Sequence, residues 1–322
     1  EVPAAQIRLP VQKPLWEEPL FWSYPPIPTL PSGHLSLADA SRNLHDFASP
    51  LISGVRTPST GTVLFIGDST MRVLAFSFCE LAHGEVKLQV QDPRADWVCR
   101  LGSYGALVFA FFHIYSLDGL NMLDFMWLQS RLVKTCGECL KTDYRIARVL
   151  HDELLEHHVW LRGRSIDMVV LNSALWDVQR PHVLVDPVPA VFARHYQERV
   201  LQVIKLVHRT LPLARNATIL WRSSTPLNEQ SEPLGLVRIG GQATTRTERS
   251  LVTLDAVSKV AVAEAASVLS IPVGYWDVRT TLLGYQFLSH DGQHYADKHL
   301  SQELINLLLN MLFETTAWRG FV

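Results

Sequence analysis

Three residues in two distant parts of the chain have the side-chain types that nucleophilic catalysis needs. Ser69 stands in Gly67-Asp68-Ser69, and Asp291 and His294 lie three residues apart near the other end of the sequence. A serine hydroxyl is a weak nucleophile unless a nearby base accepts its proton, and that base needs a partner to orient it. In a turn, this spacing places the Asp291 carboxylate beside the His294 imidazole. The sequence therefore predicts a triad of Ser69, His294 and Asp291.

The residues around Ser69 predict a local structure that would expose its hydroxyl. Residues 63–66 are a short apolar run, which is typical of a buried strand. After Ser69 the apolar residues follow helical spacing, at Met71, Leu74, Phe78 and Leu81. Ser69 would then lie in a tight turn at the N-terminus of a helix, where backbone N–H groups favour negative charge. The alternative is a turn and helix cap without catalysis, since Gly, Asp and Ser are common there.

Alternating patterns in the rest of the chain predict the elements that would position these residues. Further strands are expected at 86–90, 106–114, 166–171, 217–221 and 271–278, and helices at 120–133, 144–158, 192–207, 251–268 and 300–311. Because strands alternate with helices, we expect an α/β fold: a three-layer α/β/α sandwich with a mainly parallel, flavodoxin-like central sheet. Such sheets bind ligands at the carboxyl ends of their strands, which polar residues follow here.

The remaining residues divide the chain into two parts of unequal size. Residues 1–60 are rich in proline and show little periodicity, so we expect an N-terminal extension packed on the domain. Residues 61–322 form the expected catalytic domain. The chain begins at Glu1, which leaves open the removal of a leader or an N-terminal membrane anchor.

Composition excludes several classes of partner. The 322-residue chain is 48% hydrophobic and 19% charged, with a net charge of −2 and scattered basic residues. These values argue against nucleic-acid binding and against a polybasic membrane surface. The strongest apolar region, 106–128, is interrupted by polar residues, so no membrane segment is expected within this chain. We also expect no permanently bound cofactor.

The cysteines and a glycosylation motif indicate the cellular compartment in which the protein is found. The four cysteines are an even number, and Asn216 opens an Asn-Ala-Thr acceptor sequence. Cys136 and Cys139 are separated by two residues, and we interpret this pair as a local disulfide rather than a zinc or redox site. Together these features favour the secretory pathway, in the Golgi lumen or outside the cell.

A histidine-rich stretch near the C-terminus offers a metal site as an alternative to the triad. It contains His290, Asp291, His294 and His299. The spacings are irregular and no second cluster of ligands is evident, so we expect no metal.

Four widely spaced blocks resemble the SGNH/GDSL hydrolase superfamily. They are Gly-Asp-Ser-x-x-Arg at 67–72, Asn-Ser-x-Leu-Trp-Asp at 172–177, Trp-Arg followed by Thr-Pro within 221–226, and Asp-Gly-x-His-Tyr at 291–295. In this order they resemble the PC-esterase branch, which includes the plant trichome-birefringence-like and the eukaryotic Cas1-type carbohydrate O-acetyltransferases. The plant subgroup carries Asp-Cys-x-His-Trp at the last block, whereas Asp-Gly-Gln-His-Tyr is closer to the Cas1-like pattern, so the acceptor stays open.

The resemblance implies roles for the residues within these blocks. Ser69 would attack the acyl group, with His294 as base and Asp291 as its orienting partner. The backbone at Gly67, Asp68 and Ser69 and the side chain of Asn172 would surround the oxyanion, with Gly102 or Gly105 as a further donor. Arg72 and Arg222 would bind an acidic substrate group or support the site, and Trp176 would stack on a sugar ring.

The same resemblance implies a serine-dependent O-acetyltransferase acting on a glycan or polysaccharide. An acyl-enzyme would form on Ser69, and the acyl donor would be acetyl-CoA or an acetylated metabolite. Two alternatives stay open: an O-acetylesterase or lipid-type esterase of the same superfamily, and a non-catalytic glycan-binding module.

Overall fold

A computed structural model describes the residues that form the sheet, its covering helices and the connections between them. The described residues are 62–81, 85–88, 97–101, 106–112, 166, 168–175, 177–178, 187–210, 217–229, 247–289, 291–297, 299–305, 307–308 and 311. All of them belong to one compact unit, Leu37–Val322. The predicted boundary at residue 60 and the helices predicted at 120–133 and 144–158 lie outside the described residues and stay predictions.

The described strands form one seven-stranded sheet in the order β2-β3-β4-β1-β5-β6-β7. Four parallel pairings join β4 to β1, β1 to β5, β5 to β6, and β6 to β7, while β2 and β3 are antiparallel to their neighbours. The bounds are β1 Thr62–Gly67, β2 Glu85–Leu88, β3 Trp97–Leu101, β4 Ala106–Phe112, β5 Met168–Leu171, β6 Thr218–Arg222 and β7 Val273–Trp276. The predicted α/β fold with a mainly parallel sheet is confirmed.

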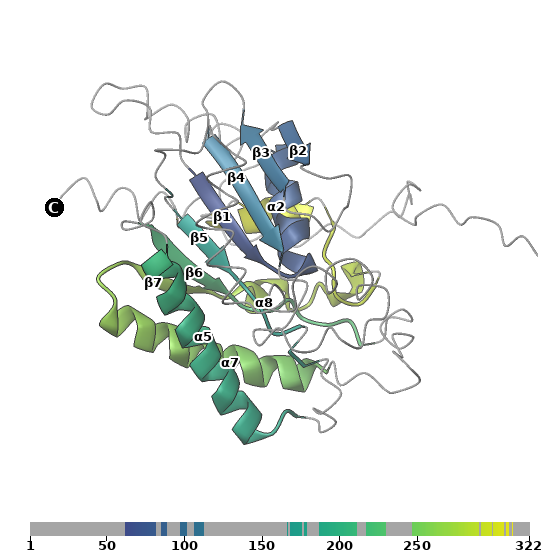
Figure 1. The fold of residues 1–322 in the computed structure, drawn as a ribbon. Helices are drawn as coiled ribbons and strands as arrows, with labels where there is room; N and C mark the ends of the chain where they lie inside the picture. Colours follow the sequence, from purple (N-terminus) through teal and green to yellow (C-terminus); the bar gives the residue numbers. More distant parts are fainter. Residues whose placement is uncertain are drawn as a thin grey trace, which may run out of the picture. The chain divides into compact units, whose positions relative to one another are not determined.

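The strand order creates a switch point at β1. The chain passes from β1 to β4 on one side and then returns to β5 on the other side. The strands that follow β1 in the parallel sheet lie on its two opposite sides. This arrangement opens a crevice at the carboxyl ends of the central strands, where ligands of doubly wound sheets bind. Figure 1 shows β1 between β4 and β5.

Both faces of the central strands β1 and β5 are buried, and each face has its own core. Along β1, Leu64 and Ile66 pack in one cluster, whereas Val63 and Phe65 pack in the other. This division follows from the two-residue period of a strand, which points successive side chains to opposite faces. Four consecutive apolar residues are therefore required here because helices cover both sides.

Two long helices cover the face of Leu64 and Ile66. They are α5, Ala190–Thr210, and α7, Glu248–Val268, and they pack against each other (Figure 1). α2, Ser69–Leu81, lies on the opposite face together with α8, Val278–Leu282, and the helical residues 299–305. A short 3-10 helix, η6, spans Gln286–Leu288. No helix in the described ranges is long and apolar enough to cross a membrane.

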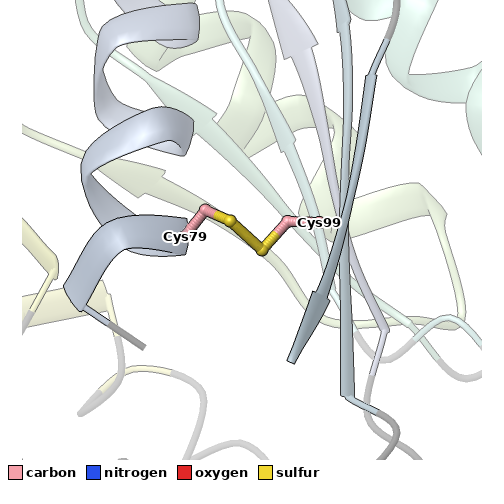
Figure 2. The surroundings of a disulfide bond; sticks show 2 residues. All are labelled: Cys79 and Cys99. Atoms are coloured by element: carbon pink, nitrogen blue, oxygen red, sulfur yellow. A yellow bond between two sulfur atoms is a disulfide. The ribbon is translucent and has the colours of Figure 1, made fainter. Parts of the chain in front are cut away.

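A disulfide bond joins α2 to β3. Cys79 and Cys99 are both fully buried and form the bond shown in Figure 2. The sequence analysis gave these two cysteines no partner, because neither their separation of 20 residues nor their surroundings identify a pair. Cys136 and Cys139 lie outside the described residues, so the bond predicted between them stays a prediction.

The sequence patterns located most of the elements within two or three residues of their bounds. The exceptions are β3, α8 and η6, which the sequence analysis did not predict. β3 is a short strand with a charged residue, Arg100, among its five. Its antiparallel position beside β4 depends on pairing with a partner, which a local pattern does not reveal.

Candidate active site

Ser69 lies where strand β1 meets helix α2, at the carboxyl edge of the sheet. β1 ends at Gly67, Asp68 forms a bend, and α2 begins at Ser69. Asp68 is buried, and its carboxylate accepts hydrogen bonds from the backbone N–H and the hydroxyl of Thr70, at 2.9 and 2.6 Å. Asp68 therefore acts as the helix cap that the sequence allowed for, while the side chain of Ser69 stays partly exposed.

Gly67 is required because Asn172 approaches the turn closely. A Cβ atom at position 67 would lie 1.8 Å from Oδ1 of Asn172, which real structures do not allow. That oxygen accepts a hydrogen bond from the backbone N–H of Asp68 at 3.2 Å. Asn172 follows β5 and is itself held by a backbone bond to Ile66 of β1, at 3.1 Å. The absence of a side chain at Gly67 thus lets Asn172 reach the nucleophile turn.

The hydroxyl of Thr70 joins three elements of the site. It donates to Asp68, as described above, and it accepts hydrogen bonds from Nδ2 of Asn172, at 3.4 Å, and from Nη2 of Arg222. A threonine hydroxyl has one hydrogen and two lone pairs, so these contacts use all of its capacity. The carboxyl ends of β1, β5 and β6 are therefore connected through one buried side chain.

Arg222 lies beneath the turn rather than on an open surface. Its side chain is 1% exposed, and it reaches from the end of β6 to Thr70. Burial lowers the pKa of Arg222 from its ordinary value, and the negative charges of Asp68 and Asp255 oppose that shift. Of the two roles considered from sequence, this position favours support of the turn over contact with a substrate.

Asp291 and His294 lie in a tight turn after η6. Oδ1 of Asp291 accepts the backbone N–H groups of Gln293 and His294, at 3.1 and 2.8 Å. Gly292 has a φ of 83°, which L-residues rarely adopt and which glycine adopts without strain. The turn leaves the second carboxylate oxygen, Oδ2, free to meet Nδ1 of the His294 ring, and these two atoms are hydrogen-bonded.

The imidazole of His294 links the two ends of the predicted triad. Its Nε2 lies 2.7 Å from Oγ of Ser69, although the two residues are 225 positions apart in the sequence. Its Nδ1 meets Asp291, which fixes the tautomer in which Nε2 can accept the serine proton. The His294 side chain is 21% exposed and that of Asp291 43%, so a substrate can reach this chain of contacts from solvent.

The environment keeps Asp291 ionised. Its partial burial raises the pKa, but the hydrogen bond and charge of His294 and the two backbone N–H groups outweigh that effect, so the pKa is lowered from 3.8 to about 2. A carboxylate with this pKa is negatively charged at neutral pH. It can therefore stabilise the imidazolium that forms when His294 takes a proton.

A buried ion cluster lies beside the triad. Arg279 of α8 is paired with Asp255, 2.6 Å from Nε, and with Glu248, and both carboxylates belong to α7. Burial lowers the pKa of Arg279, but the charges of Asp255 and Glu248 outweigh this effect and leave the pKa above its ordinary value. The same guanidinium also contacts Ser224 and the carbonyl of Thr225, just after β6.

The structure brings together most of the predicted site residues, but not all of them can be assessed. Ser69, Asp291 and His294 are in direct contact, and Asn172 and Asp68 adjoin Ser69. Arg72 lies on α2 with a partly buried side chain. Outside the described residues lie Trp176, Gly102, Gly105 and the acceptor Asn216, whose predicted roles stay predictions.

Sequence reasoning missed Thr70, Asp255, Arg279 and Glu248. One signal was available: Asp255 falls on the buried face of the helix predicted at 251–268, together with Leu251, Leu254 and Val262. A carboxylate on an apolar face needs a buried cation as a partner. Nothing in the local sequence distinguishes Arg279 as that cation. Thr70 follows the nucleophile directly and carries no pattern of its own.

The described residues contain no group of three or more His, Cys, Asp or Glu side chains that could hold a metal ion. His290, one member of the histidine-rich stretch, lies outside the described ranges. His294 uses both ring nitrogens in contacts with Ser69 and Asp291, which leaves neither of them directed at a metal.

Comparisons with known proteins find structural likeness but no sequence relative. No family model matches the chain, and no curated protein matches it. The carbohydrate acetylesterase Est24 from Sinorhizobium meliloti is 13% identical, with a TM-score of 0.41, over 79% of this chain and 98% of that one. The aryl esterase from M. smegmatis is 14% identical, with a TM-score of 0.39, over 79% of this chain and 99% of that one.

An alcohol dehydrogenase from the archaeon Thermococcus sibiricus scores similarly: it is 12% identical, with a TM-score of 0.36, over 78% of this chain and 91% of that one. Esterases and a dehydrogenase thus match at about the same level. The likeness does not separate these activities, and the function must be argued from the site itself.

Proposed function

We propose that this chain is a serine-dependent acyl-transfer enzyme that acts on O-acetyl groups of carbohydrates. The observation that supports this proposal is the continuous chain of contacts from Ser69 Oγ through both nitrogens of His294 to the Asp291 carboxylate. These three groups occupy the carboxyl edge of a parallel sheet at its switch point. A helix cap or a structural histidine would account for each residue singly, but neither would require both contacts of the His294 ring together.

The first half of the reaction makes an acyl-enzyme. Ser69 Oγ attacks the carbonyl carbon of an acetyl donor while Nε2 of His294 takes the hydroxyl proton, and Asp291 stabilises the imidazolium. The tetrahedral intermediate then collapses. His294 returns the proton to the leaving group, which is an alcohol oxygen of an ester donor or the sulfur of CoA, and the acetyl group stays on Ser69 as an ester.

The oxyanion of that intermediate needs donors that are already in place. The backbone N–H of Ser69 is at the N-terminus of α2, where the helix dipole favours negative charge. The amide of Asn172 is fixed by Asp68 and Thr70, and Nδ2 carries a second hydrogen besides the one directed at Thr70. We assign the Ser69 N–H and Asn172 Nδ2 as the oxyanion donors.

The second half of the reaction decides between transfer and hydrolysis. His294 deprotonates an acceptor hydroxyl, which attacks the Ser69 ester and regenerates the free serine. A sugar hydroxyl as acceptor gives an O-acetyltransferase, and water gives an O-acetylesterase. The resemblance of the four sequence blocks to carbohydrate O-acetyltransferases supports a glycan acceptor, with acetyl-CoA or an acetylated metabolite as donor.

We also propose an oxidising compartment for this enzyme. The buried Cys79–Cys99 bond supports that placement, because structural disulfides are rare in reducing compartments. The acceptor sequence at Asn216 points in the same direction. Expression with a secretion signal, followed by mapping of the glycan at Asn216, checks this placement. A chain that forms neither the glycan nor the disulfide there would contradict it.

The acyl-enzyme can be tested by intact-mass measurement after incubation with p-nitrophenyl acetate. Wild type should gain one acetyl group and release p-nitrophenol, and Ser69→Ala should do neither. Ser267→Ala is the matched control: this serine is exposed on α7, where its hydroxyl donates to the carbonyl of Glu264, so labelling should persist. A folded wild-type protein that shows neither turnover nor labelling would contradict the proposal and favour a glycan-binding module.

A further inference from the structure

The ion cluster of Arg279, Asp255 and Glu248 is connected to the turn that carries the catalytic base. Arg279 is 6% exposed, and its guanidinium contacts four neighbours: Nε meets Asp255, Nη1 meets Glu248, and Nη2 meets Ser224 and the carbonyl of Thr225. These contacts use the fork geometry of a guanidinium, which an ammonium group cannot reproduce.

Ser224 is held from more than one direction. Its backbone N–H and its hydroxyl donate to the two carboxylate oxygens of Asp255, at 2.9 and 2.7 Å. Ser223 adds a further link, because its hydroxyl accepts the backbone N–H of Arg279 at 2.8 Å. The segment 223–228, which follows β6, is therefore fixed to α7 and α8 through buried charges.

The segment 223–228 is in turn hydrogen-bonded to residues on both sides of His294. Thr225 Oγ1 donates to the carbonyl of Gln293, at 3.0 Å, and the hydroxyl of Tyr295 donates to the carbonyl of Pro226, at 2.8 Å. The backbone N–H of Asn228 also reaches the carbonyl of Gly292, at 2.9 Å. The position of the imidazole relative to Ser69 thus depends on where this segment lies.

We propose that Arg279 is a positioning residue that sets the distance between His294 and Ser69 through the segment 223–228. The inference rests on the proposed acyl-transfer function, for which His294 is the base. A buried ion pair contributes little net stability compared with apolar packing, so stability alone does not explain this cluster. A fixed base is what the reaction needs, since a displacement of about 1 Å can cost roughly 100-fold in rate.

The proposal predicts a kinetic effect that a purely structural role would not produce. Arg279→Lys keeps the charge between Asp255 and Glu248 but loses the fork that reaches Ser224 and Thr225. Its kcat for p-nitrophenyl acetate should fall by roughly 10- to 100-fold, with KM changed by less than about threefold. Arg249→Lys, on the exposed side of α7, is the matched control and should leave both constants unchanged.

A double-mutant cycle identifies the route of the effect. Thr225→Val removes the hydrogen bond to Gln293 and leaves the ion cluster intact. If Arg279 acts through the segment 223–228, the double variant should lose little more activity than the more severe single variant. Fully additive losses of activity in the double variant, or a change in KM with kcat unchanged, would overturn the proposal. Should Arg279→Lys fail to fold, a wild-type kcat in Thr225→Val would overturn it.

A measurement without turnover separates this proposal from the proposed function. The side-chain ¹⁵N and ¹H resonances of His294, assigned by comparison with His294→Gln, report the contacts of its two ring nitrogens. They should shift in Arg279→Lys and Thr225→Val and not in Arg249→Lys. Unshifted resonances would overturn the positioning role. An inactive wild type that still shows the shifts would contradict the acyl-transfer function and leave the positioning role supported.

Discussion

Local patterns around Ser69 and around Asp291 and His294 explain why the sequence could identify the three residues of the proposed triad. Asp291 and His294 are three residues apart, and a single turn is enough to bring carboxylate and imidazole together. Ser69 was identified differently, from the change of apolar spacing on either side of it. In both cases the geometry is decided within a few residues, so a local pattern could predict it.

The pH dependence of activity follows from the lowered pKa of Asp291. With a pKa of about 2, Asp291 stays ionised above pH 3 or so, and its ionisation cannot produce an inflection there. The loss of activity on the acidic side should therefore reflect the uptake of one proton and not two, because Asp291 takes up none in this range. The profile of log kcat/KM against pH should therefore have a limiting slope of one, and a slope of two would contradict this expectation.

The lowered pKa of Asp291 also determines the pH range in which its ionised carboxylate stabilises the folded chain. Because the pKa of Asp291 is lower in the folded chain than its ordinary 3.8, its contribution to stability is complete above that value. It is lost as the pH falls through about 2.

Asp291→Asn should remove the orienting charge and lower kcat by roughly 10,000-fold. Glu264→Gln, on the exposed face of α7, should leave kcat unchanged.

At the scale of elements, the turn after β5 contains backbone strain. Ala174 is buried and has a φ of 101°, which non-glycine residues rarely adopt. Asp177 holds this conformation by accepting the Ser173 hydroxyl and, at 3.1 Å, the backbone N–H of Ala174. The strained residue lies two positions after Asn172, so the turn that follows the proposed oxyanion donor is also the turn that stores strain.

Substitution of Ala174 by glycine should relieve this strain. Ala174→Gly should raise the free energy of unfolding by about 1 kcal/mol, because strain of roughly 1–3 kcal/mol outweighs the added entropy of the unfolded chain. Ala193→Gly, at a buried site inside α5, should instead lower it by about 1 kcal/mol or more. Urea denaturation measures both values. Equal losses of stability would contradict the interpretation of Ala174 as strained.

The elements show which part of the fold a sequence can predict. The buried strands β1 and β5 are uninterrupted apolar runs, and α5 has a clear helical period, so each was located from its own residues. The order of the strands was not predictable, because β1 pairs with partners that begin 44 and 106 residues after its own first residue, Thr62. Contacts of this range depend on tertiary packing, and so do those of Thr70 and Arg279.

At the scale of the whole molecule, the switch point of the sheet explains why the site forms where it does. The ends of β1, β5 and β6 supply Ser69, Asn172 and Arg222, and the turn at 291–294 closes over them. Each of these residues lies at an element boundary, where the packing of the two cores does not dictate the side chain. Polar residues can therefore gather at this edge without disturbing either apolar face.

The Cys79–Cys99 bond joins α2 to β3 at a point remote from the reacting atoms. Its removal should therefore affect the stability of the fold more than the rate of the reaction. A cross-link that closes a loop of 20 residues stabilises a folded chain by about 3 kcal/mol in the chain-entropy model. Cys79→Ala/Cys99→Ala should therefore lower the Tm by roughly 4–6 °C. The kcat at 25 °C should change little, because neither sulfur contacts the triad or the residues that position it.

Both cysteines are fully buried, so reductant cannot reach the bond in the folded chain. The bond can therefore also be tested in the unmodified protein. Reductant should leave the bond intact at 25 °C and should break it once the chain unfolds on heating. Alkylation followed by mass analysis of the peptides that contain Cys79 and Cys99 measures that reduction directly. A lower kcat with an unchanged Tm in the double variant would contradict the prediction. That result would mean that the bond holds α2, and with it Ser69, in register with His294.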